Sequence, residues 1–287
     1  MTDITFIEPD TVPDVLEILS HKSGAHIVAG GQFLVEQLVA HKIVPHTLIS
    51  LRRVSRLCGF THSSDGSVLI GAMTTHRAIA ETDCLRGSHR LLSEAARQIA
   101  GPAIRNVATI GGSICCADAS LDYPAVLATL DACVRIVGPA GERTLPILDF
   151  YAQKGIRDAE LLVEVQLPPS PTHSLALYER VVRCEQDVPI LSVALHISMK
   201  RNVCCAAAIG LGSCGPAPVR LTSVEKRLQD TSLNENDIAG ACVSIGEYVN
   251  AHDDVRATAA YRSILAPRVV ARALRTIAKS IETDHLV

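Results

Sequence analysis

The stretch Asn106-Val-Ala-Thr-Ile-Gly-Gly-Ser113 ends a short apolar run on a Gly-Gly turn, and His26-Ile-Val-Ala-Gly-Gly-Gln-Phe33 repeats the arrangement nearer the N-terminus. Glycine has no side chain, so a ligand can approach the backbone of such a turn closely and accept hydrogen bonds from its N–H groups. A dinucleotide pyrophosphate has the charge and the oxygen atoms that suit two such turns. The pair therefore predicts a dinucleotide site.

Neither turn has the spacing of the commoner nucleotide-binding loops. The sequence around them matches neither the Gly-x-Gly-x-x-Gly of a Rossmann site nor the Gly-x-x-x-x-Gly-Lys-Ser/Thr of a P-loop. A single Gly-Gly after a strand most often only connects two elements. A dinucleotide bound here would therefore need a site of another type.

Composition excludes several classes of partner. The chain has 287 residues, of which 48% are hydrophobic, enough for the cores of about two domains. Its net charge of -3, with acidic and basic residues interspersed, gives no footprint for nucleic acid or for a membrane surface. The first residues do not resemble a signal peptide, and no apolar run reaches the length of a membrane span. We expect a cytoplasmic protein without membrane insertion.

The ten cysteines do not have the spacing of a metal site. Cys115-Cys116 and Cys204-Cys205 are adjacent pairs and the others stand alone, so the sequence has no Cys-x-x-Cys arrangement for zinc or an iron–sulfur cluster. The eleven histidines form no His-Glu-x-x-His pattern. We predict that this chain holds no metal.

Hydrophobic periodicity divides the chain at Leu167-Pro-Pro-Ser-Pro171, because consecutive prolines cannot continue a strand pairing. Before this point helices and strands alternate, and residues 107–110 are expected to form one of the strands. Beyond it, residues 175–183, 190–200 and 204–212 predict an antiparallel meander. Helical periodicity follows over 219–228, 238–249 and 259–281, with Asp237 and Thr258 as expected caps.

Four blocks of sequence together resemble one family, the FAD-binding medium subunit of molybdenum hydroxylases, whose members include relatives of carbon monoxide dehydrogenase and xanthine dehydrogenase. The resemblance covers essentially the whole chain, in order and at similar spacing. The blocks are Ala29-Gly-Gly-Gln-Phe-Leu34, Gly101-Pro-Ala-Ile-Arg-Asn-Val-Ala-Thr-Ile-Gly-Gly-Ser113, Ala117-Asp118 with Asp122, and Arg256-Ala-Thr-Ala-Ala-Tyr-Arg262 followed by Arg272-Ala-Leu274.

This resemblance implies an α+β fold. A two-lobed FAD-binding domain of the vanillyl-alcohol-oxidase (PCMH) type is expected over residues 1–168, with lobes of about 1–55 and 56–168. A C-terminal domain of the CO dehydrogenase flavoprotein type, with a three-stranded antiparallel sheet and helices, is expected over 172–287.

The resemblance also implies a function. The chain would be an FAD-dependent electron-transfer subunit that takes electrons from the 2Fe-2S clusters of a small partner subunit and passes them to an external acceptor. A large molybdopterin-binding subunit would carry out the hydroxylation, in a heterohexamer with two copies of each chain. This chain itself would contribute no catalytic acid or base.

Matching positions give the expected FAD contacts. Asp122 matches an acid that contacts the cofactor, but it could equally cap the helix around Pro124. Leu162 matches a backbone contact, although core packing is the ordinary role of such a leucine. Arg180 replaces a lysine near the flavin, or is a surface charge on an edge strand. The expected contacts are Ala29, Gly30, Gly31, Gln32, Phe33, Leu34, Thr109, Ile110, Gly111, Gly112, Ser113, Asp122, Leu162 and Arg180.

Several departures from the family pattern keep alternatives open. Val188 stands where many bacterial relatives have an aromatic residue that covers the flavin, Ser113 stands where asparagine is common, and Ser120 and Leu121 replace small residues. The main alternative function is a scaffold that has lost FAD and holds partner subunits together. A second alternative is a free-standing flavin oxidase, for which the sequence shows no compelling acid–base pair. Because the turns are expected to cradle the pyrophosphate, replacing Gly111 or Gly112 with Val should abolish FAD retention without unfolding the chain.

Overall fold

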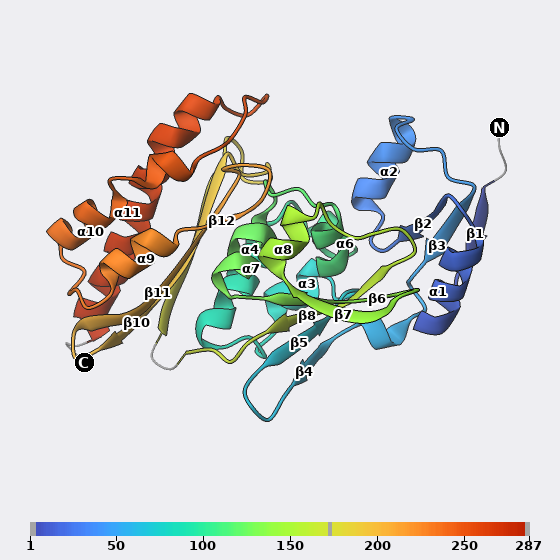
Figure 1. The fold of residues 1–287 in the computed structure, drawn as a ribbon, viewed down its shortest axis with the longest axis horizontal. Coiled ribbons are helices and arrows are strands. Elements are labelled where there is room, and N and C mark those ends of the chain that lie inside the picture. Colours follow the sequence, from blue (N-terminus) through green and yellow to red (C-terminus); the bar gives the residue numbers. More distant parts are fainter. Residues whose placement is uncertain (1–3, 172–173, 285–287) are drawn as a thin grey trace.

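A computed structural model describes residues 4–171 and 174–284, which form three β-sheets with helices packed on them (Figure 1). The first sheet is parallel, with strand order β1-β3-β2. It packs on α1, whose N-cap is Thr11. The Thr11 side chain accepts a hydrogen bond from the backbone of Asp14. The elements of this lobe are β1 (Thr5–Ile7), α1 (Val12–His21), β2 (Ala25–Val28), α2 (Gln32–Val39) and β3 (Thr47–Ser50).

The central sheet is antiparallel, with strand order β4-β5-β8-β6-β7, and carries the largest core. Its helices lie on one face (Figure 1). Its strands are β4 (Phe60–His62), β5 (Val68–Gly71), β6 (Cys133–Gly138), β7 (Gly141–Pro146) and β8 (Leu161–Leu167). The helices are α3 (His76–Glu81), α4 (Arg90–Gln98), α5 (Pro102–Arg105), α6 (Ile110–Cys115), α7 (Asp122–Thr129) and α8 (Ile147–Ala152).

The third sheet is antiparallel and lies between the central helices and a C-terminal group of helices (Figure 1). Its strand order is β12-β11-β10-β9. The strands are β9 (Ser174–Val181), β10 (Leu191–Lys200), β11 (Val203–Gly212) and β12 (Val219–Arg220). The helices that cover it are α9 (Thr222–Leu228), α10 (Glu235–Cys242) and α11 (Ala259–Asp284). Three short 3-10 turns, at Ser55–Leu57, Gly87–His89 and Ile245–Tyr248, complete the described elements.

Helix α7 lies where the central and third sheets meet, and all of its residues are buried. The Thr129 hydroxyl donates to the carbonyl of Ala194 on β10 at 3.0 Å. The Arg220 guanidinium of β12 donates to the carbonyl of Ala128 at 2.8 Å. Both bonds join a side-chain donor to a backbone carbonyl, and together they fix the third sheet against α7.

The α+β fold class is confirmed, and three details differ from the sequence prediction. The third sheet has a fourth strand, because residues 219 and 220 pair with β11 before α9 begins; a two-residue strand is too short to show alternation. Residues 107–110 form no strand but lead into α6, for which Thr109 is the N-cap. Helix α10 is capped by Asn234, with Asp237 as the reciprocal partner of the capping box. No helix in the described ranges is long and apolar enough to cross a membrane.

Candidate functional site

The two Gly-Gly turns touch each other, although 80 residues of sequence separate them. A Cβ atom on Gly30 would lie 2.2 Å from the carbonyl oxygen of Val107, so only glycine allows the first turn to approach this segment. A Cβ atom on Gly112 would lie 3.6 Å from the Cβ of Ala29. The fold thus places both turns at one location, where the first lobe meets the central helices.

The first turn has free backbone donors. Gly31 is the N-cap of α2 and has a φ of 72°, a left-handed conformation that favours glycine. Nothing within 4–171 or 174–284 accepts the backbone N–H groups of Gln32, Phe33 and Leu34. The first N–H groups of a helix have no intrahelical acceptor, and they attract anions. This turn therefore has the donors that a pyrophosphate requires.

The second turn differs from the sequence-based expectation, because its backbone donors are already used. Gly111 donates to the carbonyl of Ala72 at 2.8 Å, and Gly112 donates to the Thr109 hydroxyl oxygen at 3.1 Å. The N–H groups of Ile110 and Ser113 also have acceptors in the chain. A Cβ on Gly111 would lie 2.7 Å from the Ala72 oxygen. Gly111 is thus required for packing, and a valine there would disrupt the fold rather than only the ligand site.

Asp122 and Arg180 form a buried ion pair where α7 meets β9. Their side chains are 6% and 4% exposed, and the Arg180 Nη1 lies 2.8 Å from the Asp122 Oδ1. The Tyr178 hydroxyl donates to the same oxygen at 2.7 Å. Burial raises the pKa of Asp122 above its ordinary value, while the Arg180 charge and the Tyr178 hydrogen bond oppose this shift.

These contacts contradict both simple alternatives for the pair. Asp122 is the first residue of α7 but makes no capping hydrogen bond, and Arg180 is not a surface charge even though β9 is an edge strand. The Arg180 guanidinium also donates to the carbonyl groups of Gln98, Glu185 and Asp187. It thereby fixes the segment that contains Val188, which is 38% exposed.

Leu162, unlike this polar pair, is an apolar core residue. It is a buried residue of β8, paired in register with Ile136, and its side chain belongs to the central hydrophobic core. Only its backbone would be available to a cofactor. Ile110 is likewise a core residue, because its side chain is fully buried beneath the second turn.

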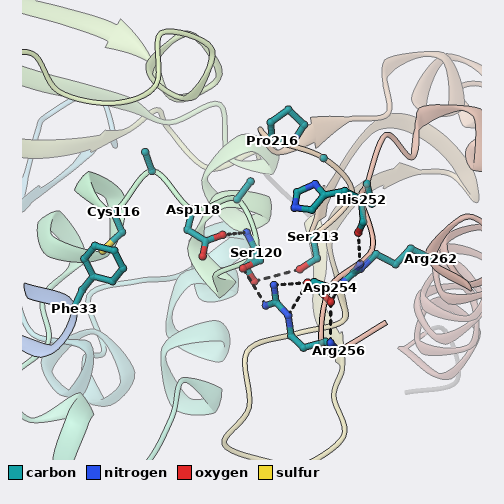
Figure 2. Close-up of a pocket in the computed structure, with 14 residues that line it drawn as sticks. Phe33, Cys116, Asp118, Ser120, Ser213, Pro216, His252, Asp254, Arg256 and Arg262 are labelled. Carbon is teal, nitrogen blue, oxygen red and sulfur yellow. Dashed lines mark hydrogen bonds and ion pairs between the residues drawn. The ribbon is translucent and has the colours of Figure 1, made fainter. Parts of the chain in front are cut away.

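A pocket of about 410 Å³ opens beside Phe33 (Figure 2). Phe33 and Cys116 border one side, and loops of the C-terminal region border the other. Phe33 is the only expected contact that lines it. Several other walls come from the Ala117-Asp118 and Arg256–Arg262 motifs, whose residues were not among the expected FAD contacts. The lining residues are Phe33, Cys116, Ala117, Asp118, Ala119, Ser120, Ser213, Gly215, Pro216, Ala251, His252, Asp254, Arg256 and Arg262.

Asp254 organises the C-terminal side of this pocket. Its carboxylate accepts hydrogen bonds from Arg262 at 2.9 Å and from Arg256 at 2.7 Å. Burial alone would raise the pKa of Asp254, but the hydrogen bonds from Arg262, from the Ala257 backbone and from Arg256 hold it well below its usual range. The carboxylate is therefore charged at any physiological pH, and the two arginines leave one positive charge in excess.

Among the described residues, no cluster of three or more His, Cys, Asp or Glu could hold a metal ion. All ten cysteines are free. Burial raises the pKa of the Cys116 thiol, at the edge of the pocket, to about 11, so this group is protonated and unreactive at neutral pH.

Two protein-family profiles together match nearly the whole chain. The family profile "FAD binding domain in molybdopterin dehydrogenase" matches residues 2–170, and "CO dehydrogenase flavoprotein C-terminal domain" matches 176–277. The chain belongs to this flavoprotein family. The resemblance drawn from the sequence blocks is thereby confirmed.

Individual relatives of the flavoprotein are similar along their full length. The 6-hydroxypseudooxynicotine dehydrogenase complex subunit alpha of Paenarthrobacter nicotinovorans is 32% identical over 96% of this chain and 94% of its own. The carbon monoxide dehydrogenase medium chain of Afipia carboxidovorans is 30% identical over 93% of each chain. The crystal structure of quinoline 2-oxidoreductase from Pseudomonas putida 86 is 27% identical, with a TM-score of 0.90 over 97% of this chain and 98% of that chain.

In this flavoprotein the first Gly-Gly turn fits FAD better than the second Gly-Gly turn does. The first turn combines close backbone access with free N–H groups. At the second turn the polar groups left for a ligand are hydroxyls: the Ser113 side chain is partly exposed, and the buried Thr109 hydroxyl accepts from Gly112 but still has its own proton to donate. The fit therefore depends on the backbone of one turn and on the side chains of the other.

Proposed function

We propose that this chain is the FAD-binding electron-transfer subunit of a molybdenum hydroxylase complex. It would receive electrons from the 2Fe-2S clusters of a small partner subunit and pass them to an external acceptor. The substrate would be hydroxylated on a large molybdopterin-binding subunit. The proposal follows from family membership and from the juxtaposition of the two Gly-Gly turns, which is the observation that carries it.

The chain's own residues would bind and orient the cofactor. The N–H groups of Gln32, Phe33 and Leu34 suit a pyrophosphate, and the hydroxyls of Thr109 and Ser113 suit its remaining oxygen atoms. Bound FAD supplies a ring system that accepts and releases electrons. The buried Asp122 and Arg180 would contribute a fixed, overall neutral ion pair to the polar environment of that ring.

The assembly is also a proposal. The names of two relatives, a "complex subunit" and a "medium chain", support partner subunits of other sizes. Helix α2 has no buried residue and exposes Phe33, Val35 and Val39, an apolar surface that suits cover by a cofactor or by another chain. We propose a cytoplasmic heterohexamer. We also retain the expected domain limits, with the FAD-binding domain over 1–168 and the C-terminal domain over 172–287.

The test is the absorbance spectrum of the purified chain, followed by denaturation and chromatography of any released flavin. The expected result is FAD at about one per chain, as a single site requires. Release of no flavin, together with failure of added FAD to bind when both partner subunits are present, would instead support the scaffold function. Co-purification with two unrelated chains separates a subunit from a free-standing oxidase.

A further inference from the structure

The 117–121 connection joins two segments that the cofactor proposal uses. It begins after α6, the helix of the second Gly-Gly turn, and ends at Asp122. Ala117 has a φ of 51°, a left-handed conformation that is unfavourable for alanine and persists only where the surroundings enforce it. The 117–121 connection therefore keeps its conformation only because neighbouring segments of the protein hold it in place.

The C-terminal domain holds the connection at two consecutive residues. The Ser213 backbone N–H donates to the carbonyl of Ala119 at 3.0 Å, and its hydroxyl is shared between the carbonyls of Pro189 at 2.9 Å and Ser120 at 3.3 Å. The Arg256 Nη1 donates to the Ser120 hydroxyl at 3.1 Å (Figure 2). Ser120 is itself buried, so this hydrogen bond lies largely out of water.

Arg256 is well suited to fix this hydroxyl. Its Nε and Nη2 both donate to the Asp254 Oδ2, at 3.0 and 2.7 Å, which sets the plane of the guanidinium. Asp254 is in turn held by Arg262, whose side chain is 2% exposed. The remaining nitrogen, Nη1, then points at Ser120. A lysine in this place could not make both contacts, because its ammonium group is a single point on a flexible stem.

We propose that Arg256 is a positioning residue for the cofactor site: it fixes Ser120, and through it the connection that leads to Asp122. The inference rests on the proposed binding of FAD. It assigns a role to the Arg-Ala-Thr-Ala-Ala-Tyr-Arg block, which lies 136 residues from Ser120 in the sequence. Arg256 acts through Ser120 and not by contact with the cofactor.

A double-mutant cycle on the full-length chain tests this. FAD is added to the apoprotein of Ser120→Ala, Arg256→Gln and the double variant, and the dissociation constant is read from flavin fluorescence. Each single change should weaken FAD binding about tenfold, as the loss of one charge-assisted hydrogen bond predicts. The double variant should also be about tenfold weaker, because both changes remove the same contact. The melting temperature of the Ser120→Ala apoprotein should fall by no more than about 5 °C, the shift expected for the loss of one hydrogen bond in a chain of this size.

Two further variants separate positioning from other effects. Arg256→Lys keeps the charge and should bind FAD as weakly as Arg256→Gln. Arg275→Gln on α11, which removes an exposed ion pair with Glu235 of α10, should bind FAD like wild type. Full affinity in Ser120→Ala or Arg256→Lys, or a hundredfold loss in the double variant, would overturn the proposal. If Arg256→Gln fails to fold, Ser120→Ala alone decides. A wild-type chain that binds no FAD would overturn the proposed function together with this inference.

Discussion

The Arg180 guanidinium and the Asp122 carboxylate are each other's charge partner inside the protein, 2.8 Å apart and almost completely removed from water. Removing one member of such a pair leaves the other charge buried alone, at a cost of roughly 3–5 kcal/mol. We expect Arg180→Gln to lower the free energy of unfolding by about that amount, measured by urea denaturation. The variant Asp122→Asn with Arg180→Gln should lose clearly less than the sum of the two single changes; additive losses would show that the charges do not interact.

The glycines of the second turn should respond differently to alanine. Gly111→Ala places a Cβ atom 2.7 Å from the backbone of Ala72, so it should lower the melting temperature. At Gly112 the new Cβ would meet only the Thr109 hydroxyl at 3.1 Å and Ala29 at 3.6 Å, so Gly112→Ala should fold normally but bind FAD more weakly.

Gly240 provides the control for these two variants. It lies on the exposed side of α10, and a Cβ there meets nothing within 4 Å. Gly240→Ala should be neutral or stabilise the chain by up to about 1 kcal/mol, with unchanged FAD affinity. Unaltered FAD binding by Gly112→Ala would remove the second turn from the proposed site.

Phe33 and Val35 are a matched pair on α2, because their side chains are 50% and 52% exposed and only Phe33 lines the pocket. Neither Phe33→Ala nor Val35→Ala should change the melting temperature by more than a degree or two, since little buried surface is lost. Titration with FAD should show weaker binding for Phe33→Ala alone. Equal effects of both changes would indicate a general role of α2 instead.

Acid should destabilise the protein through its buried histidines. Burial lowers the pKa of His76 to about 4, with the Arg105 charge adding to the effect. Burial also lowers the pKa of His196 to about 4, with the Arg220 charge adding to it. The unfolded chain, with a histidine pKa near 6.5, binds protons that the folded chain does not. Stability should therefore fall as the pH decreases from 6.5 to about 4, by up to roughly 3 kcal/mol for each residue.

A variant can isolate the contribution of His196. The Nδ1 atom of this side chain has no hydrogen-bond partner, so the neutral ring can be replaced at small cost. His196→Gln should lose less stability than wild type between pH 6.5 and 4, measured as melting temperature against pH. The exposed His46→Gln should retain the wild-type slope. Parallel curves for His196→Gln and wild type would mean that His196 is protonated freely in the folded chain.

Helix caps could be predicted from the sequence, because the two residues of each capping hydrogen bond are close in the chain. Thr258 is expected to cap the last helix and does so, because its hydroxyl needs only the backbone N–H of Tyr261, three residues further on. At the helix that begins at Glu235 the cap is Asn234 and not the expected Asp237, since the two residues cap reciprocally and either one fits the pattern. That error is three residues.

The site depends on contacts between distant segments, which no local pattern contains. The Gly-Gly motif did not reveal that the carbonyls of Ala72 and Thr74 already occupy donors of the second turn. Nor did the alternation of β9 reveal that Arg180 reaches α7, 58 residues earlier in the chain. The first turn has the free N–H groups that its motif predicted, whereas the N–H groups of the second turn are already used within the chain.

Arg256 lies 136 residues after Ser120, and this separation affects how the protein is made. A ribosome will have completed the FAD-binding domain long before the residue that fixes the 117–121 connection is synthesised. Until β9 emerges, Asp122 also lacks its charge partner. A nascent chain can therefore form the central sheet early, but FAD binding at full affinity must wait for Arg256, just before the last helix. Products of premature termination would bind FAD more weakly although they have lost no residue of either Gly-Gly turn.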